Sequence, residues 1–233
     1  MSWKVEGATW TGTIKTVGAG KDYATIAAAL VANPAGDILL LVDSGTYTAD
    51  LSGPSHWNGR KVRIRGQGAD YAAVVVTGRL LFTAANAEDI IVENVDMHFS
   101  SGFAGQIYQS AGSVNLKISK SRVLNSTANR GIVASAPDAN YEPTILFTQC
   151  YIDQEQGYYW WYGGDSSHKL DLDHISLNKI RAGSDPFGSY TINALAQNDY
   201  VKVDTENYGP AYGDYLIQEE ASAPSFKPKI ILL

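Results

Sequence analysis

The chain has 233 residues, of which 18 are Lys or Arg and 24 are Asp or Glu, so its formal net charge is −6 at pH 7. This length fits one β-solenoid domain or at most two ordinary domains. The acidic balance argues against a nucleic-acid binder, which needs clustered cations along the phosphates. No apolar run approaches the ~18 residues of a membrane span. The 22 glycines and 14 tyrosines favour strands and turns over helices.

The first segment, residues 1–15, is predicted to be an N-terminal arm that carries Trp3 and Trp10. It lacks the apolar core of a secretory signal, so we expect no signal peptide. The chain has a single cysteine, Cys150, which rules out an internal disulfide framework and is expected to be a small buried residue.

Residues 16–36 predict a capping turn followed by a helix. Asp22 is a suitable N-cap, and Pro34 and Gly36 end the helical pattern. Apolar residues at helical spacing place one face of this helix against a core: Tyr23, Ile26, Ala27, Leu30 and Val31. We expect the helix to cover the N-terminal end of the structure that follows.

Residues 37–208 carry a repeated pattern in which apolar residues occupy relative positions 0, 2, 5 and 7. The step of two is a strand with alternate residues inward, and the step of three inserts one residue at a corner. The copies begin at positions 40, 62, 90, 116, 145, 170 and 201, about 27 residues apart on average. Each unit also has an earlier apolar stretch, and stacked units bury each other's edges. The pattern predicts an all-β chain: a parallel β-helix, or single-stranded solenoid, of about six or seven coils.

Residues 16–30 (TVGAGKDYATIAAAL), 36–42 (GDILLLV) and 44–47 (SGTY) resemble the N-terminal cap and first coil of the pectin-lyase-like right-handed β-helix superfamily. That superfamily includes pectate lyases, pectin methylesterases, polygalacturonases and many phage tailspike or virion proteins. The resemblance implies a right-handed parallel β-helix with an N-terminal capping helix. It is specific for fold and not for chemistry, because these residues cap and turn the chain.

The resemblance implies that an enzyme of this kind would gather carboxylates, with an Arg, a Lys or Ca²⁺, on one outward sheet. Stacking the copies brings together only one acidic group on the outward positions. Its members are weak catalytic candidates: Asp171, Asp173, Asp204, His174 and Lys202. They could bind Ca²⁺ or act as the acid and base of a glycosidase. The alternative is a surface pair of Asp171 with Lys202, the other carboxylates standing in water. We favour that alternative, with no catalytic residue, no metal and no cofactor.

Two apolar features predict an interaction surface. The aromatic run 158–162 places about half of its rings outward in a strand, where they fit a protein interface or a sugar ring. The alternative is that the inward rings fill a wide part of the core and the others shield a loop. The C-terminal extension, residues 209–233, ends in an extended apolar segment that would seal the last coil or add to a neighbour's sheet edge. With the two tryptophans of the arm, the predicted interface residues are Trp3, Trp10, Tyr158, Tyr159, Trp160, Trp161, Tyr162, Phe226, Ile230, Ile231, Leu232 and Leu233.

Two functions remain in view. The first is a non-enzymatic structural protein of a phage virion, a capsid decoration (cement) or tail-associated protein that binds other virion proteins and copies of itself. We expect no nucleic-acid or membrane partner. The second is a polysaccharide-binding or polysaccharide-cleaving protein, either a tailspike module or a pectate-lyase-like enzyme (a polysaccharide lyase or glycoside hydrolase), with a surface glycan as its ligand. We favour the first because the outward carboxylates converge poorly.

Overall fold

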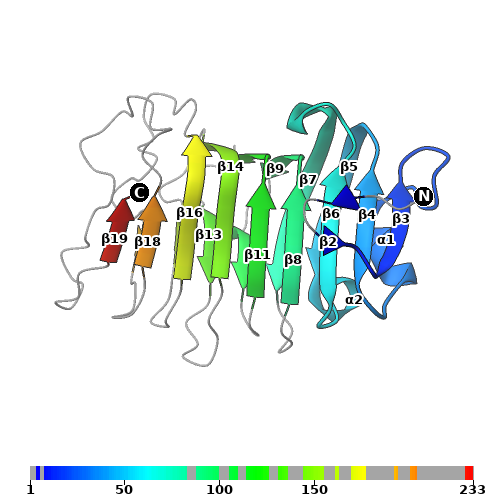
Figure 1. Cartoon of the computed structure of the whole chain (residues 1–233), viewed down its shortest axis with the longest axis horizontal. Helices are drawn as coiled ribbons and strands as arrows, with labels where there is room; N and C mark the ends of the chain where they lie inside the picture. The colour runs from blue at the N-terminus through cyan, green and yellow to red at the C-terminus, as the bar shows by residue number, and fades with distance from the viewer. Residues whose placement is uncertain are drawn as a thin grey trace.

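The computed structural model describes residues 4–5, 8–82, 88–99, 105–109, 114–125, 131–135, 144–154, 161–162, 169–176, 192–193, 200–203 and 229–232. Side chains are described for residues 10–51, 55–81, 89–98, 115–124 and 148–150. The chain is mostly β, and its parallel strands stack into an elongated solenoid with β3 and β19 at opposite ends (Figure 1). The prediction of a parallel β-solenoid is therefore confirmed.

Three parallel ladders form the walls of the solenoid. The first contains β3 (Thr13–Val17), β4 (Ile38–Val42), β6 (Lys61–Gly66), β8 (Glu88–Glu93), β11 (Val114–Ser119), β14 (Thr144–Gln154), β16 (Lys169–Ser176), β18 (Tyr200–Val203) and β19 (Lys229–Leu232). The second contains β5 (Gly45–Ser52), β7 (Val74–Phe82), β9 (Asp96–Phe99), β12 (Arg122–Asn125) and β14. The third contains β7, β10 (Gly105–Gln109), β13 (Gly131–Ser135), β15 (Trp161–Tyr162) and β17 (Ile192–Asn193).

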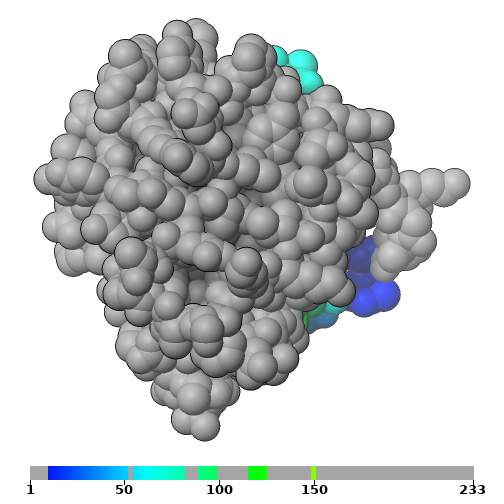
Figure 2. Space-filling model, turned by 90° about the vertical axis from the view of Figure 1, so that its left-hand side faces the viewer, coloured from blue at the N-terminus to red at the C-terminus, as the bar shows by residue number. Residues whose placement is uncertain are grey.

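Short elements lie outside these ladders. They are an antiparallel pair, β1 (Lys4–Val5) with β2 (Ala8–Thr9), the helices α1 (Ile26–Ala32) and α2 (Gly53–His56), and a 3₁₀ turn at Tyr71–Ala73. In Figure 2, which faces the side that carries β19, N-terminal residues (blue) are visible only at the rim of the outline. That view agrees with turns stacked along one long axis.

The strand register follows the predicted repeat from its second copy onward. Val62 pairs with Ile90, and the pairing continues to Leu116, Ile145, Leu170 and Val201. The first copy was predicted wrongly. Ile38 pairs with Val62, whereas Leu40 pairs with Ile64, so the repeat begins two residues earlier. The error arises because β4 is apolar at every position, and alternation cannot then distinguish inward from outward residues.

In three of the copies, the extra residue between the two short strands adopts a left-handed conformation. Its φ is 56° at Asn94, 50° at Lys120 and 54° at Gln149. The backbone nevertheless stays bonded along the stack, because Asn94 N–H donates to Ser119 O and Lys120 N–H donates to Thr148 O, both at 3.0 Å. The Asn94 amide also donates to two carbonyls of the preceding turn, those of Gly66 and Gly68. The predicted corner is confirmed in these copies.

The core is a single apolar cluster inside the solenoid, extending from Val17 to Cys150 among the described side chains. Helix α1 contributes Ile26, Ala29 and Leu30 to it. Two details of the predicted helix were wrong. Thr25 is the N-cap, its hydroxyl accepting from Ala28 N–H at 3.1 Å, while Val31 is 53% exposed. The helix begins three residues later than a cap at Asp22 requires.

A buried arginine joins α1 to the segment after β5. The Arg60 guanidinium donates to the carbonyls of Leu30 and Asn33 at the end of α1, and to those of His56 and Trp57. Helix ends leave such carbonyls without partners, so Arg60 satisfies both short helices with one cation. The Trp57 ring is fully buried, and its Nε1 donates to Leu81 O at 2.9 Å.

Candidate functional site

The structure places part of the predicted acidic group together. Asp171 of β16 stands directly opposite Lys202 of β18, as the repeat predicts. Asp173 stands opposite Thr148 of β14, and His174 occupies the corner position next to it. Asp204 lies outside the described residues, as do the side chains of β16 and β18. In the strand register, therefore, one aspartate position (Asp171) is paired with one lysine position (Lys202).

The predicted aromatic surface is only partly within the described chain. Trp161 and Tyr162 form β15, which pairs with β13 and β17. Trp10 is half-buried, and its Nε1 donates to Thr13 O at 3.3 Å. The other aromatic interface residues lie outside the described residues: Trp3, Tyr158, Tyr159, Trp160 and Phe226.

The C-terminal segment continues the chain's own first ladder. Ile230, Ile231 and Leu232 belong to β19, which pairs in parallel with Val201, Lys202 and Val203. Leu233 lies outside the described residues. Of the two expectations for this segment, addition to the last turn of its own solenoid is therefore the one observed at the backbone.

A first cluster of charged side chains lies on the outer face of β6 and β8. Arg63 donates to Oε2 of Glu93 through Nε at 2.9 Å and through Nη2 at 2.6 Å. Glu93 is only 6% exposed although it points away from the core, and Arg65 stands opposite it in the ladder. The carboxylate is thus held by a guanidinium and largely removed from solvent. One of its oxygens, Oε2, is therefore already engaged by a cation of the neighbouring turn.

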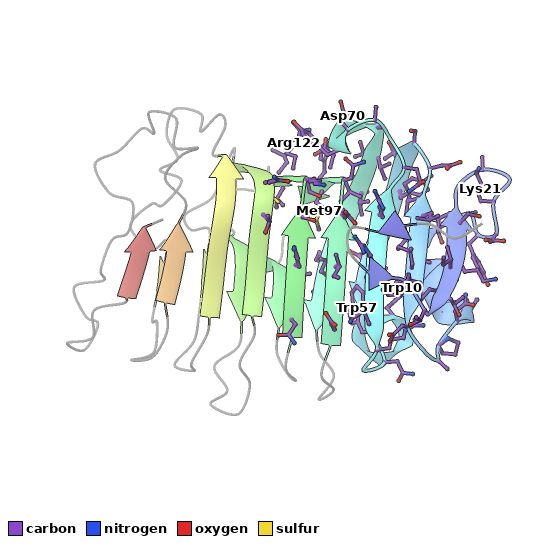
Figure 3. The ribbon with its side chains drawn as sticks, in the orientation of Figure 1. Trp10, Lys21, Trp57, Asp70, Met97 and Arg122 are labelled. Atoms are coloured by element: carbon purple, nitrogen blue, oxygen red, sulfur yellow. The ribbon has the colours of Figure 1, made fainter. Side chains whose placement is uncertain are left out.

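A second cluster lies across the corner, on β9 and β12. Arg122 binds both carboxylate oxygens of Asp96, with Nε to Oδ1 at 2.7 Å and Nη2 to Oδ2 at 2.6 Å. His98 Nε2 lies 3.0 Å from Asp96 Oδ2 and 3.0 Å from Arg122 Nη2. Figure 3 shows Arg122 outside the solenoid wall, while Met97, the neighbour of Asp96, points into it. This pair has the bidentate, charge-assisted geometry of a strong arginine–carboxylate interaction.

Sequence reasoning did not identify this second cluster as a site. A signal was present, because Asp96 and Arg122 have opposite charges and the repeat places them directly opposite one another. His98 follows two residues after Asp96 and so shares its face of the strand.

Further ion pairs link neighbouring turns. Lys61 reaches Asp89 at 3.1 Å and Arg79 reaches Asp50 at 3.4 Å, and each pair occupies directly opposed positions in a ladder. Pairs this exposed contribute little to stability individually. Among the described side chains, Lys61 with Asp89 and Arg79 with Asp50 each form a pair between two neighbouring turns.

Metal binding and thiol chemistry have no support within the described part of the chain. No group of three or more His, Cys, Asp or Glu side chains there could hold a metal ion. Cys150 is buried as predicted, its thiol directed at Ile118 O at 3.2 Å. Burial raises the pKa of Cys150 to about 11, so the reactive thiolate is scarce at neutral pH.

A shallow surface depression lies beside the N-terminal turn and offers little for ligand binding. It is lined by Thr11, Gly12, Thr13, Gly36 and Asp37. The only carboxylate among these residues, Asp37, already accepts a hydrogen bond from Lys61 N–H at 3.2 Å.

In comparisons with known proteins, the chain matches no family model, no curated protein and no solved structure. None of the helices in the described ranges has the length and hydropathy needed to cross a membrane.

Proposed function

We propose that the chain is a non-enzymatic structural protein of a phage virion, a capsid decoration or tail-associated protein located in the particle. Its solenoid serves as a rigid spacer that binds neighbouring virion subunits and copies of itself. This proposal rests on how the carboxylates on the outer walls of the solenoid are paired. Glu93 and Asp96, the two least exposed carboxylates among the described side chains, are both bound by arginines of adjacent turns.

The proposal includes a finer description of the fold. The solenoid is a right-handed, pectin-lyase-like β-helix of six or seven coils, and α1 caps its N-terminal end. Support for the cap comes from Ile26 and Leu30, which enter the same apolar cluster as β3 and β4. Support for the coil number comes from the first ladder, in which parallel pairing continues from β3 to β19. The superfamily itself rests on the resemblance of residues 16–47.

A second candidate function is favoured by one observation. Asp171 and Lys202 are directly opposed, and Asp173 lies on the same strand two residues away, hence on the same face. No other strand in the described part of the first ladder has two aspartates at alternate positions beside a lysine of the next strand. A surface glycan, bound or cleaved at these strands, is the corresponding ligand.

Incubation with acidic polysaccharides separates the two candidates. Polygalacturonate, alginate and acidic capsular polysaccharides are each mixed with the protein, with and without Ca²⁺. Absorbance at the wavelength of unsaturated sugars reports lyase action, and reducing ends report hydrolysis. We expect no product. Product formation that Asp171→Asn or Asp173→Asn abolishes, while the matched surface variant Asp89→Asn retains it, would overturn the non-enzymatic proposal.

Location in a virion is tested separately. Particles are purified by density gradient from lysed cells that carry the gene, and gold-labelled antibody against the chain is viewed by electron microscopy. We expect label on the capsid or the tail. Purified particles that lack the chain by both labelling and mass spectrometry contradict the virion assignment.

A further inference from the structure

The N-terminal strand of the first ladder, β3, has one edge paired with β4 and one edge facing away from the solenoid. Thr13 N–H donates to Asp37 O, and Val17 O accepts from Asp43 N–H, so the odd-numbered residues of β3 face β4. Successive residues of a strand direct their backbone groups to opposite edges. The outward edge is therefore formed by Ile14 and Thr16. An unpaired edge of this kind is a template for adding a strand from another molecule.

The chain blocks this edge with its own next segment. Thr16 N–H donates to Asp22 Oδ2 at 2.9 Å, and the Thr16 hydroxyl donates to the same oxygen at 2.9 Å. Asp22 N–H donates back to the Thr16 hydroxyl at 3.2 Å. Hydrogen bonding by Thr16 lowers the pKa of Asp22, because these donors favour the charged carboxylate. Asp22, predicted as a helix cap, instead caps the edge of a strand.

Tyr23 completes the hydrogen bonding of Thr16. Its N–H donates to Thr16 O at 3.1 Å, its carbonyl accepts from Gly18 N–H at 2.9 Å, and the residue forms a parallel bridge with Val17. The loop that makes this return possible contains Gly18 and Gly20, with φ of 147° and 72°. Figure 3 shows Lys21 of this loop at the N-terminal extreme of the solenoid, outside β3. Both backbone groups of Thr16 are thus occupied by a single short return of the chain.

We propose that residues 16–23 form an edge guard, which prevents the C-terminal strand β19 of a second copy from adding to β3. The candidate occupant follows from the ladder. β19 is the strand at the other end of the same ladder and runs parallel to its neighbour, as an added strand on β3 would. Head-to-tail addition of this kind does not close, so it produces filaments. The guard keeps copies from polymerising through their sheets, whatever partner the protein binds.

The test compares three variants of the full chain. Asp22→Ala removes the acceptor, Asp22→Asn keeps an oxygen acceptor at the same position, and Asp43→Ala removes a nearby carboxylate that pairs with Lys21 but does not bond to β3. Hydrogen exchange of the Thr16 amide measures how well the outward edge of β3 is protected. Sedimentation velocity and negative-stain microscopy measure association between copies. We expect Asp22→Ala to raise Thr16 exchange at least about tenfold and to form concentration-dependent filaments. Asp22→Asn and Asp43→Ala should match the parent.

Association between copies is the decisive measurement. If Asp22→Ala frees the Thr16 amide but does not associate at any concentration, the guard function is wrong, because the exposed edge then accepts no strand. Unchanged exchange in Asp22→Ala also overturns it. If that variant does not fold, Asp22→Ser shortens the acceptor while retaining an oxygen, and it is scored by the same two measurements. Filaments that form from Asp43→Ala as readily as from Asp22→Ala would contradict the specific role of Asp22.

Discussion

Asp96 and Arg122 stand directly opposite one another on adjacent turns, and the guanidinium binds both carboxylate oxygens at 2.6–2.7 Å. Only 4% of the Asp96 side chain is exposed, against 30% of the Arg122 side chain. The aspartate has therefore lost nearly all of its contact with water and depends on its partner, whereas the arginine remains partly solvated. This asymmetry determines which substitution at the pair is the more damaging.

We expect Arg122→Ala to lower the free energy of unfolding by about 2–3 kcal/mol, because it leaves a buried carboxylate without its counter-ion. The value lies below that for a fully buried pair, since Arg122 is partly solvated. Lys61→Ala, which breaks the exposed pair with Asp89, should cost less than about 1 kcal/mol. Urea denaturation measures both. Adding Asp96→Asn to Arg122→Ala should recover part of the loss, and strictly additive losses would contradict the argument.

Arg60 is expected to contribute more to stability than any exposed ion pair. Arg60→Met keeps much of the apolar stem but leaves the carbonyls at the ends of α1 and α2 without their donor. Each buried polar group left unsatisfied costs about 1–3 kcal/mol, so we expect a loss of about 2–4 kcal/mol for the whole set. Arg65→Met, which makes the same substitution on the outer face of the following strand β6, is the matched control. Equal denaturation midpoints for the two variants would show that the carbonyls find other partners.

The register of the solenoid could be predicted from the sequence because most copies alternate apolar and polar residues. Val62 and Ile64 point inward while the residues between them are polar, and such a strand has only one favourable register. In β4 the sequence is Ile-Leu-Leu-Leu-Val. Leu39 is buried yet does not belong to the core cluster, so both faces of this strand are covered and alternation carried no information there.

The polar features were predictable to different degrees. The Asp96–Arg122 pair follows from the repeat, because the two positions are level and oppositely charged. The Arg60 cluster does not, since its partners are backbone carbonyls up to 30 residues away, which have no sequence signature. Asp22 has the residue type of a helix cap and precedes the helical pattern, but its bond to Thr16 depends on how the loop between them returns to β3. Local pattern alone could not distinguish these two roles.

The left-handed corner predicts opposite effects for glycine at two equivalent positions. Gln149→Gly should raise the free energy of unfolding by up to about 1 kcal/mol, because glycine adopts a positive φ without steric cost. Asn94→Gly gains the same relief but loses the amide bonds to Gly66 O and Gly68 O, so a net loss of about 1 kcal/mol is expected. Thermal unfolding distinguishes the two. A gain at both positions would mean that the Asn94 amide contributes nothing.

The buried thiol predicts a stability change at alkaline pH. The pKa of Cys150 is raised from 9.0 to about 11 by burial, so the unfolded chain releases the thiol proton at lower pH than the folded chain does. The contribution of this group is complete below pH 9 and declines as pH rises from about 9 to about 11. Cys150→Ala, which cannot ionise, should show a smaller decline over the same window. Urea unfolding at pH 8 and pH 10.5 tests this, and equal declines would exclude Cys150 as the cause.

The C-terminal strand predicts the result of a truncation. Ending the chain after Ser222 removes β19 and leaves β18 as an edge in the first ladder, so backbone groups of Tyr200–Val203 lose their parallel partner. We expect faster amide exchange throughout β18, because the groups that face β19 in the full chain then face solvent. The matched control, Ile231→Thr, keeps the strand and changes only a side chain. If amide exchange in the truncated protein matches that in the full chain, β19 does not protect β18. If the truncated protein also binds the particle unchanged, the segment has no docking role.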